Sequence, residues 1–250
     1  MHSYNLGFIS DQDLFNHVLE TVNKYRFVID LKEFNKNLVD PIKFSFDAHI
    51  YGKTIAQVVE AEVLRQLDKS NNNHIGYFHQ NIFKYMGNAW SVPKEGYDIE
   101  NIAEHIFVEM KNKHNTMNSS SSQKTYMRMQ HTLNQNPKAL CLLVEVIATA
   151  SQNKAWAISL DKISIVDERI RRVSIDKFYE IVTGDPFAFK RLCEVLPLVI
   201  ADVVSSLKQS DIVQNTVLTE LLAVAPDNLL KSIYWLSFQK YQGFDNFHFR

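Results

Sequence analysis

Cysteine, glycine and proline are scarce in this chain of 250 residues, which has two cysteines, seven glycines and six prolines. The two cysteines, Cys141 and Cys193, lie far apart and lack CxxC spacing. That excludes a zinc ribbon and a disulfide framework, and it suits a reducing cytoplasm. Few glycines and prolines leave few linkers, and 46% hydrophobic residues can form one sizeable core. We therefore expect a single domain, with a helical N-terminal part at 1–90, a core at 91–175 and a helical C-terminal part at 176–250.

Long apolar runs and a strong net charge are absent too. The most apolar stretches, 139–148 and 195–204, are each interrupted by an acid, so neither predicts a membrane span. The N-terminus carries Asp11 and Asp13 early and has no apolar segment typical of a signal peptide. The formal net charge is −1, so any affinity for nucleic acid has to come from a local basic patch.

The hydrophobic pattern predicts helices, then a mixed centre, then helices again. The predicted helices cover 11–25, 31–38, 54–68, 119–134, 176–182, 187–207, 212–223 and 229–241. The predicted strands cover 97–99, 105–111, 139–148, 155–160 and 170–173. The polar and aromatic stretch 71–85 is expected to follow the third helix. Strand, strand, helix and strand in the centre is the order of an α/β core.

The most informative stretch is 105–111, which alternates between apolar and other side chains. As a strand it buries one face and presents Glu109 and Lys111 side by side on the other. Asp98 lies eleven residues before Glu109. Two carboxylates can bind a hard Mg²⁺ ion that bridges a phosphate oxygen and a water, while an ammonium group two residues on positions or activates that water. The pattern is typical of the PD-(D/E)xK nucleases.

Glu-x-Lys alone is a weak signal, because it occurs by chance in most chains of this length and alternating charges are usually a solvated strand face. The residues that follow strengthen it. The stretch 112–126 contains no acid, and 105–131 holds four Lys or Arg residues and one Glu. A polar, cationic segment beside a metal site is what a phosphate backbone needs as a partner.

Three longer stretches, 72–83, 107–126 and 171–179, resemble the type II restriction endonucleases that recognise GGWCC or GGNCC, and the similarity runs from the N-terminal helix to about residue 205. The resemblance implies a PD-(D/E)xK fold, a small mixed α/β sheet flanked by helices, with helical additions at both ends. It also implies Mg²⁺-dependent hydrolysis of double-stranded DNA that leaves 5′-phosphate and 3′-hydroxyl ends. A homodimer, a cognate DNA methyltransferase in the same system and a cytoplasmic bacterial protein follow from it as well.

On this basis Asp98 and Glu109 are expected to bind Mg²⁺ with the Met110 carbonyl, and Lys111 to position or deprotonate the attacking water. Tyr97 precedes Asp98 where the wider motif has proline, so Glu100 stays open as a substitute for the first carboxylate.

A further carboxylate is open to two interpretations. Glu62 falls on the apolar face of the predicted helix 54–68. It either adds a third carboxylate to the catalytic site or pairs with Gln66 or a nearby arginine. Glu145 inside the apolar stretch 139–148 poses the same choice, between approaching the site and pairing with a basic residue.

DNA recognition is expected in 71–81 and 113–118, because both are rich in side chains that pair with base edges in the major groove. The candidate DNA-binding residues are Asn73, His74, Gln80, Asn81, Lys113, His114, Asn115, Asn118, Ser119, Gln123 and Lys124. For Gln123 and Tyr126 a capping or core role is equally open. Arg169, Arg171 and Arg172 are most simply a solvated face. The aromatic C-terminal helices, or the apolar face of 187–207, are candidates for a dimer interface.

Three rival functions remain. A noncatalytic DNA-binding protein could retain the fold, although an intact Asp98, Glu109 and Lys111 weighs against it. A repair or recombination nuclease could use the same fold, although no second domain is evident. His114 and Asn115 suggest an HNH nuclease only weakly, because the further histidines of that site are not placed suitably.

Overall fold

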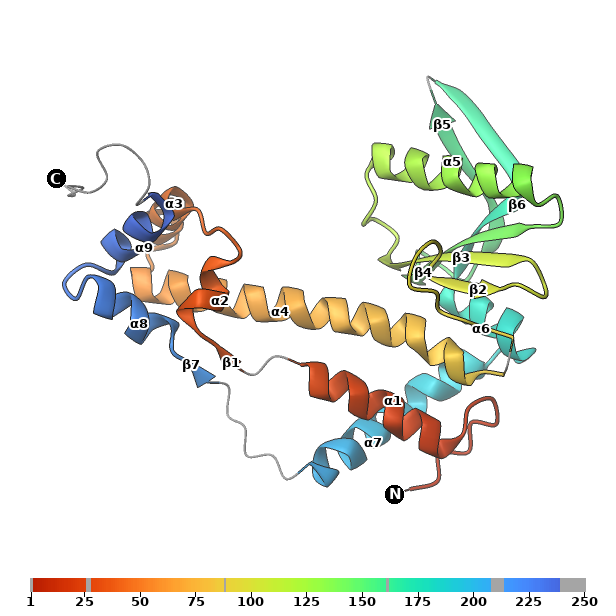
Figure 1. Cartoon of the computed structure of the whole chain (residues 1–250), viewed down its shortest axis with the longest axis horizontal. Helices are drawn as coiled ribbons and strands as arrows, with labels where there is room; N and C mark the ends of the chain where they lie inside the picture. The colour runs from red at the N-terminus through yellow and green to blue at the C-terminus, as the bar shows by residue number, and fades with distance from the viewer. Residues whose placement is uncertain (1, 26–27, 88, 161, 208–213, 239–250) are drawn as a thin grey trace. The chain divides into compact units, whose positions relative to one another are not determined.

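The computed structural model describes residues 2–25, 28–87, 89–160, 162–207 and 214–238, which are coloured in Figure 1. The chain packs as two compact units. Unit 1 comprises Met1–Asn23 and Ile75–Lys208, and unit 2 comprises Lys24–His74 and Gln209–Arg250. Each unit buries apolar side chains of its own. The one core expected from the composition is therefore divided, and a single endonuclease domain over the whole chain stays a prediction.

The centre of unit 1 is a five-stranded sheet in the order β2-β3-β4-β6-β5 (Figure 1). The strands are β2 Ile99–Asn101, β3 Ile106–Lys113, β4 Leu140–Ile147, β5 Asn153–Leu160 and β6 Ile163–Ser174. The inner strands β3, β4 and β6 run parallel, and the edge strands β2 and β5 are antiparallel to their neighbours. Parallel neighbours need a crossover connection, which α5 (Ser119–Gln135) provides between β3 and β4. The expected small mixed sheet with flanking helices is confirmed.

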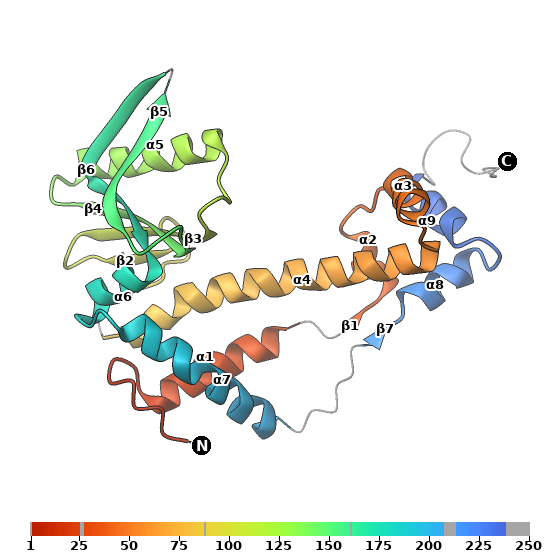
Figure 2. The same ribbon diagram turned by 180° about the vertical axis from the view of Figure 1, so that it is seen from behind.

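Helices cover both faces of this sheet, as the two opposite views show (Figures 1 and 2). On one face, α5 packs Tyr126 and Met129 with Cys141 and Leu143 of β4. The helices on the other face are α1 Asp11–Lys24, the end of α4 Ile55–Asn81, the short η1 Ile82–Tyr85, α6 Ile175–Thr183 and α7 Ala188–Ser206.

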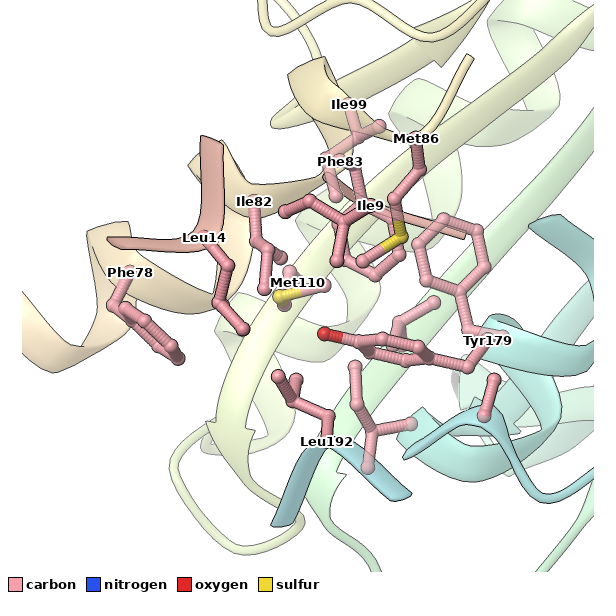
Figure 3. Packing of buried hydrophobic residues seen from close by; sticks show 14 of the residues in the cluster. Ile9, Leu14, Phe78, Ile82, Phe83, Met86, Ile99, Met110, Tyr179 and Leu192 are labelled. Atoms are coloured by element: carbon pink, nitrogen blue, oxygen red, sulfur yellow. The ribbon is translucent and has the colours of Figure 1, made fainter. Parts of the chain in front are cut away.

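The apolar side chains of β3 fix which way its charged side chains point. Met110 packs into the cluster with Leu14, Ile82 and Leu192 (Figure 3). Successive side chains of a strand alternate between its faces. With Met110 held against α1, η1 and α7, Glu109 and Lys111 lie on the face that α5 covers.

Unit 2 joins segments from opposite ends of the sequence. Its elements are β1 Val28–Ile29, α2 Leu31–Asn35, α3 Pro41–Tyr51, the first part of α4, β7 Gln214–Asn215, α8 Val217–Val224 and α9 Leu229–Phe238. β1 and β7 pair in parallel. The core of this unit gathers Phe34, Val59, Val63 and Leu221.

Two helical predictions were wrong. The helix expected to end at residue 68 continues to Asn81 as α4. Its polar middle gives no periodic signal, but Val63 and Leu67 are buried before that stretch and Phe78 after it. Helix α3 was not expected. Pro41 occupies the first turn of α3, where a missing N–H costs nothing, and the Asp40 side chain caps that turn by accepting from the Ile42 N–H.

The other expected elements are confirmed with shifted ends. The second helix stops at Asn35, the first core strand starts at Ile99, and β6 is longer than its expected segment. The helix expected at 212–223 starts at Val217, and residues 212–213 and 239–241 lie outside the described residues. Across the described ranges, the helices are all too short or too polar to cross a membrane.

Candidate active site

The first carboxylate is held by the backbone of the neighbouring strand. Asp98 directly precedes β2, and its N–H donates to the Val108 carbonyl at 2.9 Å. Its Oδ2 atom accepts from the Met110 N–H at 2.7 Å. Backbone groups of alternate residues point to the same edge of a strand, so the Met110 carbonyl also faces the edge where Asp98 lies.

The second carboxylate, Glu109, is bonded at both of its oxygens. Oε1 accepts from Lys111 Nζ at 2.6 Å, and Oε2 accepts from the guanidinium of Arg128. Glu109 is buried, while the side chains of Lys111 and Arg128 are 31% and 41% exposed. Two cations from β3 and α5 thus cover one carboxylate from the solvent side.

Asp98 titrates differently from an ordinary aspartate. Burial, and then the charge of Glu109, raise the pKa of Asp98 above its usual value. The hydrogen bond from Met110 and the charges of Lys111 and Arg128 act in the opposite direction. The carboxyl therefore lies within the electrostatic reach of both cations and of the other carboxylate.

Glu100, the substitute considered for Asp98, lies on β2 itself. Its backbone pairs with Ser91, and burial alone raises the pKa of its carboxyl. The structure brings Asp98, rather than Glu100, together with Glu109 and Lys111.

Glu145 pairs with a basic residue, which is one of the two interpretations that its position in the sequence allowed. It stands in register with Lys111 on the adjacent parallel strand, and it is 1% exposed. Arg172 Nε donates to its Oε1 at 2.8 Å, and the same guanidinium donates to the His114 carbonyl at 3.0 Å. Arg172, expected on a solvated face, is 30% exposed but pairs with a buried carboxylate, whereas the partners of Arg169 and Arg171 are Asp167 and Glu168, which are 27% and 83% exposed.

We expect Arg172→Met to lower the free energy of unfolding by about 3 kcal/mol, because it leaves the buried Glu145 charge without its cation. Arg171→Met is the control from the same strand: Arg171 donates to Asn153 and to Glu168, which is 83% exposed, so its loss leaves no buried charge without a partner. Its effect should be smaller, about 1 kcal/mol, on the scale of lost hydrogen bonds. Urea unfolding of both variants measures the difference. Equal losses of unfolding free energy in the two variants would show that the buried Arg172–Glu145 pair does not stabilise the fold more than the contacts of Arg171 do.

The expected DNA-binding residues lie in two parts of the chain: the end of β3 together with the start of α5, and the helix α4. Lys113 ends β3, and His114 and Asn115 lie in the following turn, all three exposed. Asn118 caps α5 by accepting from the Ser121 N–H, and Gln123 donates to the Ser159 carbonyl at 2.8 Å. The remaining candidates are Ser119 and Lys124, exposed on α5, and Asn73, His74, Gln80 and Asn81, which all lie within α4. Tyr126 is a core residue.

Glu62 lies on the part of α4 that belongs to unit 2. Arg65 donates to both of its oxygens, at 2.5 and 2.6 Å, and Gln66 donates at 2.9 Å. Burial opposes its ionisation, but these hydrogen bonds lower the pKa of Glu62 below its usual value. Glu62 therefore makes the contacts expected if it pairs with Gln66 and a nearby arginine. A catalytic role for Glu62 stays a prediction.

Comparison with known proteins identifies the family of this chain. The family model described as Eco47II restriction endonuclease matches residues 6–205. The type II restriction enzyme Sau96I of Staphylococcus aureus is 32% identical over 209 residues, which cover 79% of this chain and 80% of that protein. This chain belongs to the Eco47II restriction endonuclease family. The type II restriction enzyme Eco47II of Escherichia coli is 29% identical over 213 residues, 80% of this chain and 88% of that protein.

Membership in this family makes the chain a type II site-specific deoxyribonuclease whose partner is DNA. The matched range spans the sheet and α5, including Asp98, Glu109 and Lys111. The sequence interpretation missed Arg128. The excess of basic residues in 105–131 was the one sequence feature that pointed to Arg128. Sequence spacing cannot predict that an arginine on a helix contacts a carboxylate nineteen residues earlier on a strand.

Proposed function

We propose that this endonuclease cleaves DNA with Mg²⁺ bound by Asp98 and Glu109, and that Lys111 acts on the attacking water. The observation that supports the proposal is the convergence of these three side chains at β3, beside the start of β2. Asp98 is bonded to the backbone of β3, and Glu109 is bonded to Lys111.

The donor chemistry fits a hard divalent cation. Asp98, Glu109 and the Met110 carbonyl offer oxygen ligands, which Mg²⁺ prefers, and Mg²⁺ commonly uses one or two carboxylates together with substrate phosphate. Among the described residues no three His, Cys, Asp or Glu side chains group as a metal site, and the ligands proposed from the protein are these two carboxylates and one carbonyl. When bound, the ion supplies charge stabilisation at phosphorus and a more acidic water.

Lys111 provides a cation at the same place. Its ammonium group is held 2.6 Å from Glu109 Oε1 and is partly open to solvent. From there the ammonium group can donate to a water and position it for in-line attack on the phosphodiester, whereas only the neutral amine of Lys111 can accept a proton from that water; the products are 5′-phosphate and 3′-hydroxyl ends. The exposed Lys113 at the end of β3, and His114 and Asn115 in the turn after it, are proposed to contact DNA.

The proposed substrate is a GGNCC or GGWCC site, cut by a homodimer. Such a site presents the same half-site twice, which a C2 dimer meets with one active site per strand. The described part of the chain offers apolar surface for this contact on α3, where Ile42, Phe46 and Ile50 are 51, 63 and 70% exposed at helical spacing. A methyltransferase that protects the same site is proposed as the second component of the system.

Digestion of phage DNA and of a supercoiled plasmid with one GGACC site tests this function. Mg²⁺ should yield discrete phage fragments and linear plasmid with little open-circular intermediate, because a dimer cuts both strands in one encounter. A smear would contradict site specificity. Accumulation of open circles before linear product would contradict cleavage by two active sites, and no cutting in Mg²⁺ would contradict the proposed cofactor.

A further inference from the structure

Arg128 connects the two segments that carry the proposed metal-binding carboxylates. Its Nη1 atom donates to the Gly96 carbonyl at 3.2 Å, two residues before Asp98, and its Nη2 atom donates to Glu109 Oε2. The guanidinium also lies 4.7 Å from the centre of the Tyr97 ring. Tyr97 is fixed in turn by a hydrogen bond of 2.8 Å between its hydroxyl and Thr132 on the next turn of α5.

This arrangement balances the charge of the site. Asp98 and Glu109 carry two negative charges, and Lys111 and Arg128 carry two positive charges within contact of Glu109. Both Glu109 oxygens are occupied by donors. A divalent ion at Glu109 Oε2 would meet the positive guanidinium on the same oxygen, so the two cations compete for it, and a released guanidinium needs another anionic partner.

We propose that Arg128 is a positioning residue that holds Glu109 in the metal-free enzyme, competes with the divalent ion for Glu109 Oε2, and moves to a DNA phosphate when DNA and metal bind together. The inference rests on the proposed metal site. Arginine suits the role because its planar fork stacks on a ring and binds carboxylate and phosphate equally well. Exposure of 41% leaves its side chain accessible to a phosphate.

The consequence is that metal and DNA favour each other's binding. Without DNA, binding of the ion includes the cost of breaking the Arg128–Glu109 pair. With DNA, a phosphate compensates the released guanidinium, and by linkage the ion raises the affinity for DNA by the same factor. This coupling limits metal loading of the enzyme before it meets a substrate.

The test is Mn²⁺ binding to DNA-free protein, followed by the electron paramagnetic resonance of the free ion. Arg128→Met removes the charge and keeps much of the stem, so Mn²⁺ should bind about tenfold more tightly than to the wild type. Arg128→Lys keeps the charge and should stay near the wild-type affinity. Arg169→Met is the matched control, because Arg169 also donates to a backbone carbonyl and to a carboxylate, but at Pro137 and Asp167.

A second readout is the ratio of affinities for a short GGACC duplex with and without Ca²⁺. This ratio should fall at least about fivefold in Arg128→Met and stay unchanged in Arg169→Met. Unchanged Mn²⁺ affinity together with an unchanged ratio in Arg128→Met would overturn the role of Arg128. Asp98→Asn separates this failure from that of the metal site itself. If Asp98→Asn binds Mn²⁺ as the wild type does, the proposed metal site is wrong and the inference is wrong with it.

Discussion

Lys111→Ala should lower the rate of DNA cleavage by about 10²–10⁴-fold, on the scale of general-base and electrostatic contributions to catalysis. The substitution removes the cation held at Glu109 Oε1 and leaves both carboxylates in place. Cognate DNA should still bind in Ca²⁺, because phosphate and base contacts elsewhere supply the affinity. Single-turnover cleavage in Mg²⁺ and duplex binding in Ca²⁺ measure the two effects separately.

Lys138→Ala is the matched control for this variant. Lys138 is exposed in the turn that precedes β4, where its backbone N–H bonds to Asn136, and it has no proposed role in the site. It should cut at the wild-type rate. A Lys111→Ala enzyme that also cuts at the wild-type rate would show that the proposed mechanism is wrong, whereas a parallel loss of DNA binding would place Lys111 in substrate binding instead.

Asp98→Asn should abolish cleavage, by at least about 10³-fold, through loss of a metal ligand, while Glu100→Gln should cut normally. The amide keeps an oxygen that can accept from the Met110 N–H but removes the negative charge that attracts the cation. Cleavage in Mg²⁺ and Mn²⁺ binding should both be lost in Asp98→Asn. If Glu100→Gln is inactive and Asp98→Asn is active, the first carboxylate is Glu100.

The thermal stability of Asp98→Asn shows whether the variant is inactive because it has lost a metal ligand or because its fold is damaged. Burial and Glu109 raise the pKa of Asp98, so the folded protein binds this proton at a higher pH than the unfolded chain does. The ionised carboxylate therefore costs stability at neutral pH, and this cost disappears as the pH falls through the raised pKa. Asp98→Asn should leave the thermal midpoint of the metal-free protein at pH 7 unchanged or slightly higher. A midpoint several degrees lower would mean that the inactive variant is damaged in its fold.

The sequence determined the centre of the protein because its signals there are local. The alternation around Glu109 predicts a strand and its charged face, and the apolar run 139–148 predicts the buried β4. The predicted helix 119–134 corresponds to α5. The strand-helix-strand order that follows is that of an α/β core, and the alternation within one strand was enough to place Glu109 and Lys111 together.

The tertiary structure decided what depends on contacts between distant segments. The polar middle of α4 reads as a loop, since Asn and Ser favour turns, and only the buried residues before and after it show a continuous helix. Unit 2 requires the pairing of β1 with β7, which no local pattern predicts. The choice between Asp98 and Glu100, the partner of Glu145 and the contact of Arg128 with Glu109 also depend on three-dimensional proximity. The sequence gives the charge of a side chain, but the partner of that charge depends on which backbone segments the fold brings together.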